Sequence, residues 1–288
     1  MEKCNVTKNI YKNFDDCYKD VVNYICKNGT WITENVRTKY IDGTPATYKS
    51  VIGLQLEFEP TYKDRMPVAL LPTTRKATPK SSIRELFWIW IFRSNKVEDL
   101  RKLGCKYWNE FELEDGSIGR SYAYQMNKPM CGYPSQTDYV IGELKNNPNS
   151  RRILTELWHV EDTPYMSLTP CVHLTQWSVI DGKLILSVRQ RSADIALGTT
   201  ANWFQYQVLH HLIAKECGLE VGNMIWTIDN AHIYDRHIDN LQKQVNRPTL
   251  EPPTIYIPKF KSIYDLKPDM IEVRNYKSHE PIKYEVAI

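Results

Sequence analysis

The strongest constraint on the fold is a hairpin signal followed by an unusually apolar helical segment. Residues 174–180 and 184–188 are apolar runs on either side of Asp181-Gly182, a dipeptide typical of a tight hairpin turn. Further along, residues 201–217 place apolar side chains on one face at helical spacing and stop at Gly218. We therefore predict a β-hairpin and a central, buried helix in the same chain.

The remaining segments mix helical and strand patterns. Helices are expected over 9–28, closed by Gly29, over 83–92, capped by Ser81-Ser82, and over 97–104, 137–145 and 233–245. Strands are expected over 51–58, 153–158, 224–228 and near 254–257 and 270–276. Residues 36–48 read as a polar loop with a turn at Asp42-Gly43, and 105–135 as irregular. Because no repeat or low-complexity linker interrupts the 288 residues, we predict one α+β domain over 1–288.

Composition limits the compartment and the partners. Lys and Arg number 37 against 34 Asp and Glu, a net charge of +3, which argues against a dedicated nucleic-acid-binding protein. No run approaches the ~20 apolar residues of a membrane span, and the N-terminus lacks a signal-peptide pattern. The seven cysteines are odd in number and contain no C-x-x-C pair, which favours a reducing compartment and no structural zinc. We expect a soluble, cytoplasmic protein without a metal, a membrane contact or an obligatory nucleic-acid partner.

The candidate nucleophile is a cysteine that follows a proline at the start of a predicted strand. Cys171 comes directly after Pro170, and Arg189, Arg191 and His173 lie on or near the adjoining hairpin. Nearby cations stabilise a thiolate, which is a soft nucleophile suited to an electron-poor carbon such as C6 of a pyrimidine. The residues alone also fit a cysteine that only fills the core.

Arginines near turns are candidates for binding a phosphate. Arg151-Arg152 follow a turn, Arg191 ends the second hairpin strand beside Ser192, and Arg37 lies in the polar loop. Paired guanidinium groups match phosphate oxygens in a bidentate geometry. A solvated surface pair fits the same spacing.

A carboxylate and an amide are further candidates. Glu85 lies in an apolar helix, and burial there would raise the pKa of its carboxyl group into the range useful for proton transfer. Asn202 offers a donor and an acceptor, enough to read the amide edge of uracil. The spacing of His232 and His237 is not that of a zinc-binding helix. Asp194, Asp229 and Tyr234 are additional polar candidates, and each of these residues fits a structural role as well.

Together these residues resemble the folate-dependent thymidylate synthase family, and the likeness runs in order over nearly the whole chain. The blocks that carry it are Arg37-Thr38, Thr73-Thr74-Arg75, Glu85-Leu86-Phe87-Trp88, Trp108, Glu114-Asp115-Gly116, Ser150-Arg151-Arg152, Pro170-Cys171, Gln190-Arg191-Ser192-Ala193-Asp194, Leu197-Gly198, Asn202, Asp229-Asn230-Ala231-His232-Ile233-Tyr234 and Val286-Ala287-Ile288. The resemblance implies an α+β fold around a large bent mixed sheet flanked by helices, and a homodimer packed sheet to sheet. It implies dUMP as substrate, 5,10-methylenetetrahydrofolate as carbon donor and reductant, and no metal.

The resemblance also assigns roles by position. Cys171 would add to C6 of the uracil, with Glu85, Asn202, Asp194 and Tyr122 completing the catalytic set. The nucleotide would be held by Arg37, Arg191 and Ser192, by Arg151 and Arg152 of the partner subunit, by Asn202 at the base, and by His232 and Tyr234 at the sugar. The folate would contact Trp108, Asp194, Gly198, Ala287 and Ile288, whose carboxylate would help to close the site.

Departures from the family pattern cluster at the folate end. They are Val172 after the nucleophile, Phe111, Ala123, Thr199-Thr200 and Ala201. The same fold hosts pyrimidine hydroxymethylases, in which water rather than hydride completes the reaction, so a dUMP 5-hydroxymethylase that releases tetrahydrofolate is the alternative. Asn202 argues against the cytosine-specific members. A non-catalytic nucleotide- or RNA-binding homologue is disfavoured by the intact set of Cys171, Glu85, Asn202 and Asp194.

Overall fold

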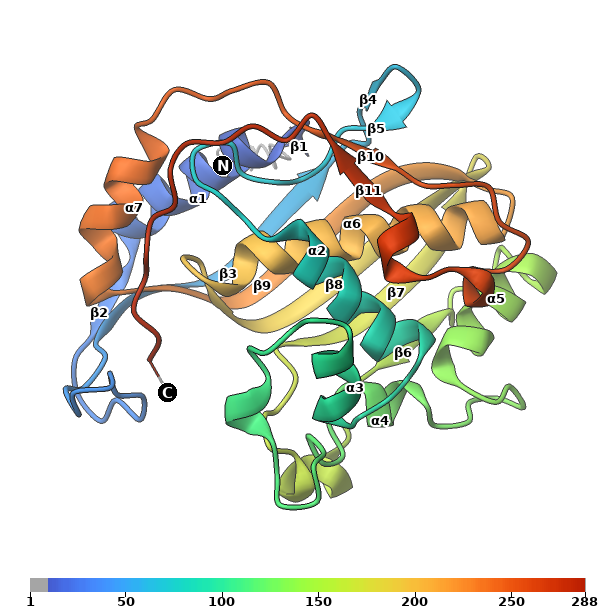
Figure 1. The fold of residues 1–288 in the computed structure, drawn as a ribbon, viewed down its shortest axis with the longest axis horizontal. Helices are drawn as coiled ribbons and strands as arrows, with labels where there is room; N and C mark the ends of the chain where they lie inside the picture. The colour runs from blue at the N-terminus through green and yellow to red at the C-terminus, as the bar shows by residue number, and fades with distance from the viewer. Residues whose placement is uncertain (1–9, 288) are drawn as a thin grey trace, which may run out of the picture.

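The body of the molecule is a seven-stranded mixed sheet (Figure 1). The computed structural model describes residues 10–287. The strands run in the order β1-β3-β9-β8-β7-β6, with β2 paired to β3. Their bounds are β1 Ile10–Tyr11, β2 Thr30–Ile32, β3 Tyr48–Phe58, β6 Leu154–Glu156, β7 Val172–Ile180, β8 Lys183–Asp194 and β9 Glu220–Tyr234. The β8–β9 and β1–β3 pairs are parallel and the other pairs antiparallel, which confirms the predicted mixed sheet.

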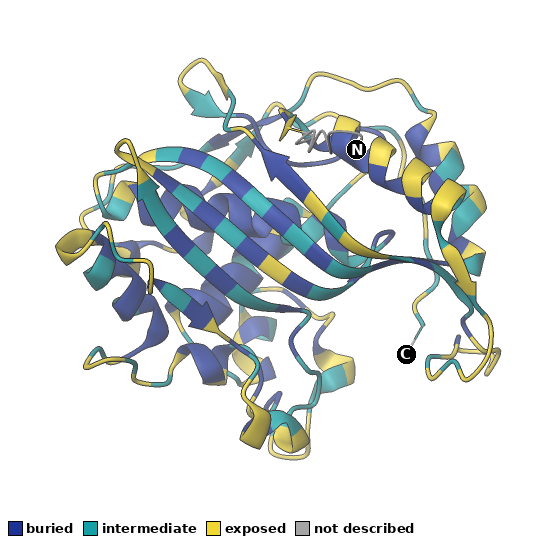
Figure 2. Ribbon diagram, turned by 180° about the vertical axis from the view of Figure 1, so that it is seen from behind, coloured by how far each residue is buried: buried dark blue, intermediate teal, exposed yellow. Residues whose placement is uncertain are grey.

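Among the described residues, helices cover one face of this sheet and none lies over the other, which we call the bare face. The α-helices are α1 Phe14–Asn28, α2 Pro79–Leu86, α3 Val97–Lys102, α4 Ala123–Met126, α5 Gln136–Asn146, α6 Gly198–Glu216 and α7 Ile238–Val245. A π-helical turn, Phe87–Ile91, continues α2, and single 3-10 turns occupy 109–111, 160–165, 235–237, 263–265 and 268–270. Two small ladders, β4 Tyr62–Lys63 with β5 Met66–Pro67 and β10 Thr254–Tyr256 with β11 Glu272–Arg274, flank the body. Seen from behind, the broad strands of the sheet face the viewer with α2 and α6 behind them (Figure 2).

An aromatic layer joins α6 to the sheet. Tyr206 of α6 packs edge-on against Trp226 of β9 at 5.4 Å and against Trp90 at 6.1 Å, and Trp90 in turn packs against Trp177 of β7 at 6.3 Å. The three tryptophans are at most 1% exposed. Burial of large aromatic side chains dominates core energetics, so the prediction of a central helix at 201–217 is confirmed, with its start moved to Gly198.

The predicted helix over 233–245 is wrong in its first turn. Ile233 and Tyr234 belong to β9, where they pair with Lys49 and Tyr48 of β3. Long-range ladder bonds decide the conformation there against a locally helical spacing. The helix begins only at Ile238.

The starts of two predicted helices also differ. Asn13 caps α1 by accepting a hydrogen bond from the Asp16 amide at 2.9 Å, so this helix begins later than expected. The end of this helix at Asn28, with Gly29 as its C-cap, is as predicted. Helix α2 begins with Pro79, whose missing N–H fits a first helical turn, and this places Ser81 and Ser82 inside the helix.

Two adjacent histidines on α6 should make folding sensitive to acid. His210 and His211 are buried, and burial lowers the pKa of His210 to about 4 and that of His211 to about 3. An unfolded histidine titrates near 6.5. The stability that each neutral imidazole gives is therefore complete above that pH and is lost as the pH falls toward the folded pKa. We expect each to lower the free energy of unfolding by about 1.4 kcal/mol per pH unit below pH ~6.

Urea unfolding at several pH values between 7.5 and 4.5, at fixed protein concentration, measures this slope. H210Q keeps a donor for the Leu184 carbonyl oxygen, which lies 2.7 Å from His210 Nε2. H210Q and H211Q should each flatten the slope, whatever they do to stability at neutral pH. Identical slopes in the wild type, H210Q and H211Q would contradict the prediction.

Candidate active site

Most of the predicted site residues meet at one edge of the sheet. Strands β8 and β9 are parallel, so their carboxyl ends lie side by side, with Ser192 opposite Asn230 and Asp194 opposite His232. Strand β7 is antiparallel to β8, so its amino end, just after Cys171, lies at the same edge. Helix α6 starts directly beyond β8 and brings Gly198 and Asn202 to this edge.

Cys171 is held by its own backbone. Its amide donates to Tyr122 Oη at 2.9 Å, and its carbonyl oxygen accepts from the Arg191 amide at 2.8 Å. The Arg191 guanidinium donates to the carbonyl oxygens of Pro170 and Thr169, both at 2.9 Å. The loop that carries the thiol is therefore fixed to the end of β8.

The electrostatics around the thiol differ from the prediction. Burial raises the pKa of the Cys171 thiol, and the nearby Arg191 charge lowers it by less. Arg189 is paired with Asp229 at 3.1 Å, and burial lowers the pKa of His173, which favours its neutral form. The expected cluster of three cations thus amounts to one, and the free site favours the protonated thiol.

Tyr122 adopts a backbone conformation that is rare for its residue type. Its φ of 32° and ψ of −95° place it outside the regions usual for non-glycine residues. Its ring is wedged edge-on against Trp108 at 5.4 Å, and its hydroxyl holds Cys171. Such strain persists only where the surroundings fix it, and it clusters at functional sites.

Glu85 confirms the environment predicted for it. The carboxylate is buried, accepts a hydrogen bond from Trp108 Nε1 and accepts another from Gln205 Nε2 at 3.0 Å. Burial raises the pKa of Glu85 although both donors lower it. Gln205 was not predicted as a site residue. The only hint of it in the sequence is a polar residue on the apolar face of α6.

Asp194 organises the turn between β8 and α6. Its Oδ1 accepts from the amides of Ala196 and Leu197 at 2.9 and 3.2 Å, and its carbonyl oxygen accepts from the Thr199 hydroxyl at 3.2 Å. The buried Arg75 donates to the Ala196 carbonyl oxygen from the other side. The departures from the family pattern at 199–201 therefore occupy the first turn of α6, beside Asn202.

The end of β9 and the polar loop form the next wall of the site. His232 packs between Tyr48 and Tyr234, with ring centroids 5.3 and 5.2 Å away, and burial lowers its pKa. Burial raises the pKa of Tyr234, while the hydroxyl of Thr38 and the charge of Arg37 act in the opposite direction. The loop thus brings the exposed Arg37 close to Tyr234.

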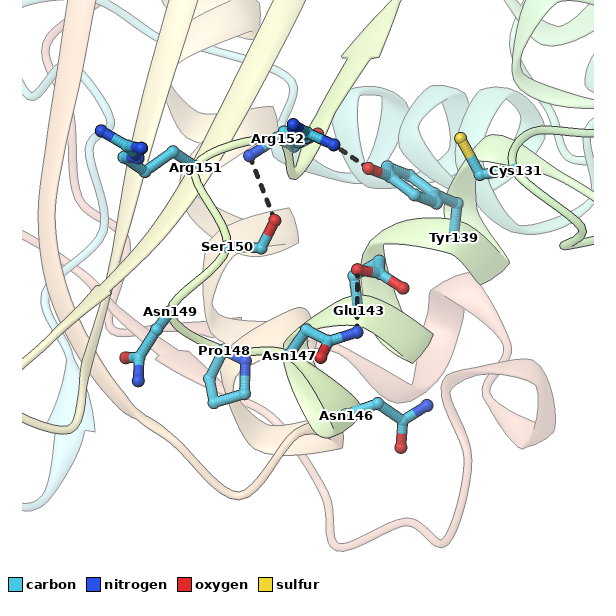
Figure 3. Close-up of a pocket in the computed structure, with 10 residues that line it drawn as sticks. All are labelled: Cys131, Tyr139, Glu143, Asn146, Asn147, Pro148, Asn149, Ser150, Arg151 and Arg152. Carbon is cyan, nitrogen blue, oxygen red and sulfur yellow. Dashed lines mark hydrogen bonds between the residues drawn. The ribbon is translucent and has the colours of Figure 1, made fainter.

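Arg151 and Arg152 lie apart from this site within one chain. They precede the edge strand β6, and the Arg151 carbonyl oxygen accepts from Gln176 Nε2 at 3.3 Å. Gln176 is five residues beyond Cys171 along β7, about 16 Å in an extended strand. Both arginines are exposed and line a surface cavity of about 700 Å³ with the end of α5 (Figure 3).

The chain end reaches the site from the other side. Ala287 forms a bridge with Tyr40 in the polar loop, and Ile288 lies outside the described residues. Within residues 10–287 no cluster of three or more His, Cys, Asp or Glu side chains has the arrangement of a metal site. None of the helices in that part of the chain is long and apolar enough to cross a membrane.

Comparisons with known proteins agree with this arrangement. The family model described as thymidylate synthase matches residues 16–288. A thymidylate synthase of Fusobacterium nucleatum is 56% identical over 275 residues, which cover 96% of this chain and 98% of that protein. Thymidylate synthase 1 of Bacillus subtilis is 44% identical over 96% of this chain and 99% of its own length.

A solved structure supports the same assignment. The thermostable thymidylate synthase A from Bacillus subtilis superposes with a TM-score of 0.88 at 42% sequence identity, over 96% of this chain and 99% of that chain. At this identity and coverage the similarity shows membership of a family as well as a shared fold. The chain belongs to the thymidylate synthase family.

Proposed function

We propose that this chain converts dUMP to dTMP by reductive methylation, with 5,10-methylenetetrahydrofolate as co-substrate. The observation that carries the proposal is a cysteine fixed between Tyr122 and Arg191 at the edge where Asn202 and Asp194 also lie. The enzyme class, a methyltransferase, follows from membership of the family. The co-substrate supplies the one-carbon unit and the hydride that reduces it.

Cys171 begins the reaction by adding its sulfur to C6 of the uracil. The thiol proton leaves as the C–S bond forms, and C5 becomes a carbanion-like centre that attacks the one-carbon unit. Because burial raises the thiol pKa, we infer that proton loss and addition occur together. Loss of the C5 proton and cleavage of the bond between the one-carbon unit and the folate nitrogen leave a methylene group on C5. Hydride transfer from the folate to this methylene forms the methyl group as the C–S bond breaks, which releases dTMP, dihydrofolate and the free cysteine.

Other residues hold the nucleotide. We assign the phosphate to Arg37, Arg191 and Ser192, and the sugar hydroxyl to His232 and Tyr234 at the end of β9. Asn202 reads the uracil edge with one donor and one acceptor. The roles follow the family pattern, and the support for them is that this chain brings the residues to a single edge.

Proton transfer and the folate occupy the side toward α2 and the start of α6. Burial raises the pKa of Glu85, which favours a carboxyl group that can hold and pass on a proton, and we place it next to the base. Trp108 packs against Tyr122 and forms the wall over the reacting carbon. Asp194 and Gly198, with Ala287 and Ile288 at the chain end, complete the folate side.

We further propose a homodimer formed through the bare face of the sheet. No helix among residues 10–287 lies over that face (Figure 2). Within the strands of the sheet, Ile52 of β3 and Ile180 of β7 are 75% and 60% exposed, and exposed apolar side chains are typical of an interaction surface. A twofold pairing would also explain the position of Arg151 and Arg152, which would reach the phosphate of the partner subunit. The odd cysteine count supports a cytoplasmic location.

Product analysis tests the reaction. Incubation with dUMP and methylenetetrahydrofolate should give dTMP and dihydrofolate in equal amounts, identified by mass. Formation of 5-hydroxymethyl-dUMP and tetrahydrofolate would replace this proposal by the hydroxymethylase. C171A should lose more than about 10⁴-fold in kcat, since the nucleophile is removed, while dUMP binding stays within about threefold. Retained turnover in C171A would exclude the covalent mechanism.

Glu85 has its own test. E85Q keeps an acceptor and the shape of the side chain but cannot carry a proton, so we expect kcat to fall by about 10²–10⁴ with little change in dUMP affinity. One limb of the wild-type pH profile of kcat, displaced above the ordinary carboxyl range, should disappear in E85Q. E110Q alters an exposed carboxylate on the 3-10 turn after Trp108 and should leave rate and profile unchanged.

Mixed dimers test the shared arginines. The double variant R151A/R152A and the variant C171A should each be inactive alone, because one loses the phosphate contacts and the other the nucleophile. When the two variants are mixed one to one and reassembled, half of the dimers contain one chain of each variant. Each of these mixed dimers has one complete site. Activity should therefore recover to about a quarter of wild type. No recovery, with dimer exchange shown by native mass spectrometry, would contradict the sharing.

A further inference from the structure

The C-terminal segment is tied down by the short stretch that follows β9. The Arg236 guanidinium donates to both carboxylate oxygens of Glu285 at 2.9 Å. Asn240 Nδ2 donates to the Lys283 carbonyl oxygen at 3.2 Å, and the Tyr284 hydroxyl donates to Gln244 at 2.7 Å. The segment that ends beside the site is thus held along the 3-10 turn 235–237 and α7.

One imidazole in this stretch faces both the segment and the site. His237 is fully buried, and its Nε2 lies 2.7 Å from the Glu285 carbonyl oxygen. A carbonyl oxygen only accepts, so Nε2 carries the hydrogen. The other nitrogen, Nδ1, is buried and has no hydrogen-bond partner among residues 10–287, and it lies 3.9 Å from Asp194 Oδ1.

The packing around His237 fixes the direction of both nitrogens. Its ring packs edge-on against Tyr234 at 5.6 Å and Tyr284 at 5.3 Å, so rotation would break both contacts and the bond to Glu285. A buried polar nitrogen without a partner destabilises the folded state. Since Nε2 already carries a hydrogen, Nδ1 can bond to the Asp194 carboxylate only with a second proton on the ring, and a relative shift of about 1 Å would bring the two atoms to hydrogen-bond distance.

We propose that His237 is a positioning residue that couples the Asp194 carboxylate to the seating of the C-terminal segment. When the segment settles, the imidazole donates from Nε2 to Glu285 and, carrying a second proton, from Nδ1 to Asp194. Folate binding at Asp194 and ordering of the chain end then favour each other through one side chain. This rests on the proposed function, since it assigns Asp194 to the folate side.

Two substitutions separate the two nitrogens. H237Q can place an amide donor near the position of Nε2 and keeps the bond to Glu285, but it has nothing at the position of Nδ1. We expect H237Q to weaken folate binding to the enzyme–dUMP complex about tenfold, with dUMP affinity within about twofold of wild type. H237N places its amide toward Asp194, and should regain part of the folate affinity while losing protection of the chain end.

A matched control uses the neighbouring contact that does not face Asp194. N240A removes only the bond to Lys283, so it should speed hydrogen exchange in 282–287 without changing the folate affinity of the dUMP complex by more than about twofold. In a double-variant cycle, H237Q should add nothing to D194N, because D194N already removes the charged partner. Additive effects of H237Q and D194N on folate affinity would overturn the coupling.

A readout without folate distinguishes this inference from the proposed function. D194N keeps the acceptor for the Ala196 and Leu197 amides but loses the charge that attracts Nδ1. It should therefore speed hydrogen exchange in 282–287 severalfold in the wild-type background and have no effect in H237Q. Equal effects in both backgrounds would overturn the inference, even if the enzyme forms dTMP as proposed.

Discussion

The site depends on the parallel pairing of β8 with β9 inside an otherwise largely antiparallel sheet. If β9 ran the other way, His232 would lie at the opposite edge from Asp194, to which it is now directly paired. The crossover that makes the pair parallel is α6, and the same helix carries Asn202 into the site. One connection therefore sets the strand direction, buries the aromatic core and brings to the site Asn202, the side chain that we propose reads the base.

Local sequence patterns correctly predicted those elements that are determined by residues close together in the sequence. The hairpin at Asp181-Gly182 and the apolar face of α6 are of this kind, and both are confirmed. The helix predicted at residues 233–234 is wrong because these residues pair with Tyr48 and Lys49, almost two hundred residues earlier in the sequence. No local spacing could reveal that pairing. The starts of α1 and α2 were predicted wrongly because several residues near each start are able to cap a helix.

For the candidate site, residue identity was easier to predict than environment. The burial of Glu85 and its raised pKa follow from an acidic residue in an apolar helix. The thiol of Cys171 was expected to be stabilised as a thiolate, and burial reverses that balance. Gln205 and His237 were not predicted as site residues because each lies beside a carboxylate that is distant in sequence. Gln205 donates to Glu85, and His237 lies 3.9 Å from Asp194.

The position of Arg191 connects these observations. Its Nε and one terminal nitrogen are already bound to the loop before Cys171, so only part of the guanidinium is left for a ligand. The same bonds keep its charge near the sulfur, which lowers the thiol pKa without overcoming burial. An arginine that positions the nucleophile cannot neutralise a phosphate dianion by itself. The proposed clamp therefore needs Arg37 and, across the bare face of the sheet, the partner's Arg151 and the partner's Arg152, which makes the dimer part of the chemistry.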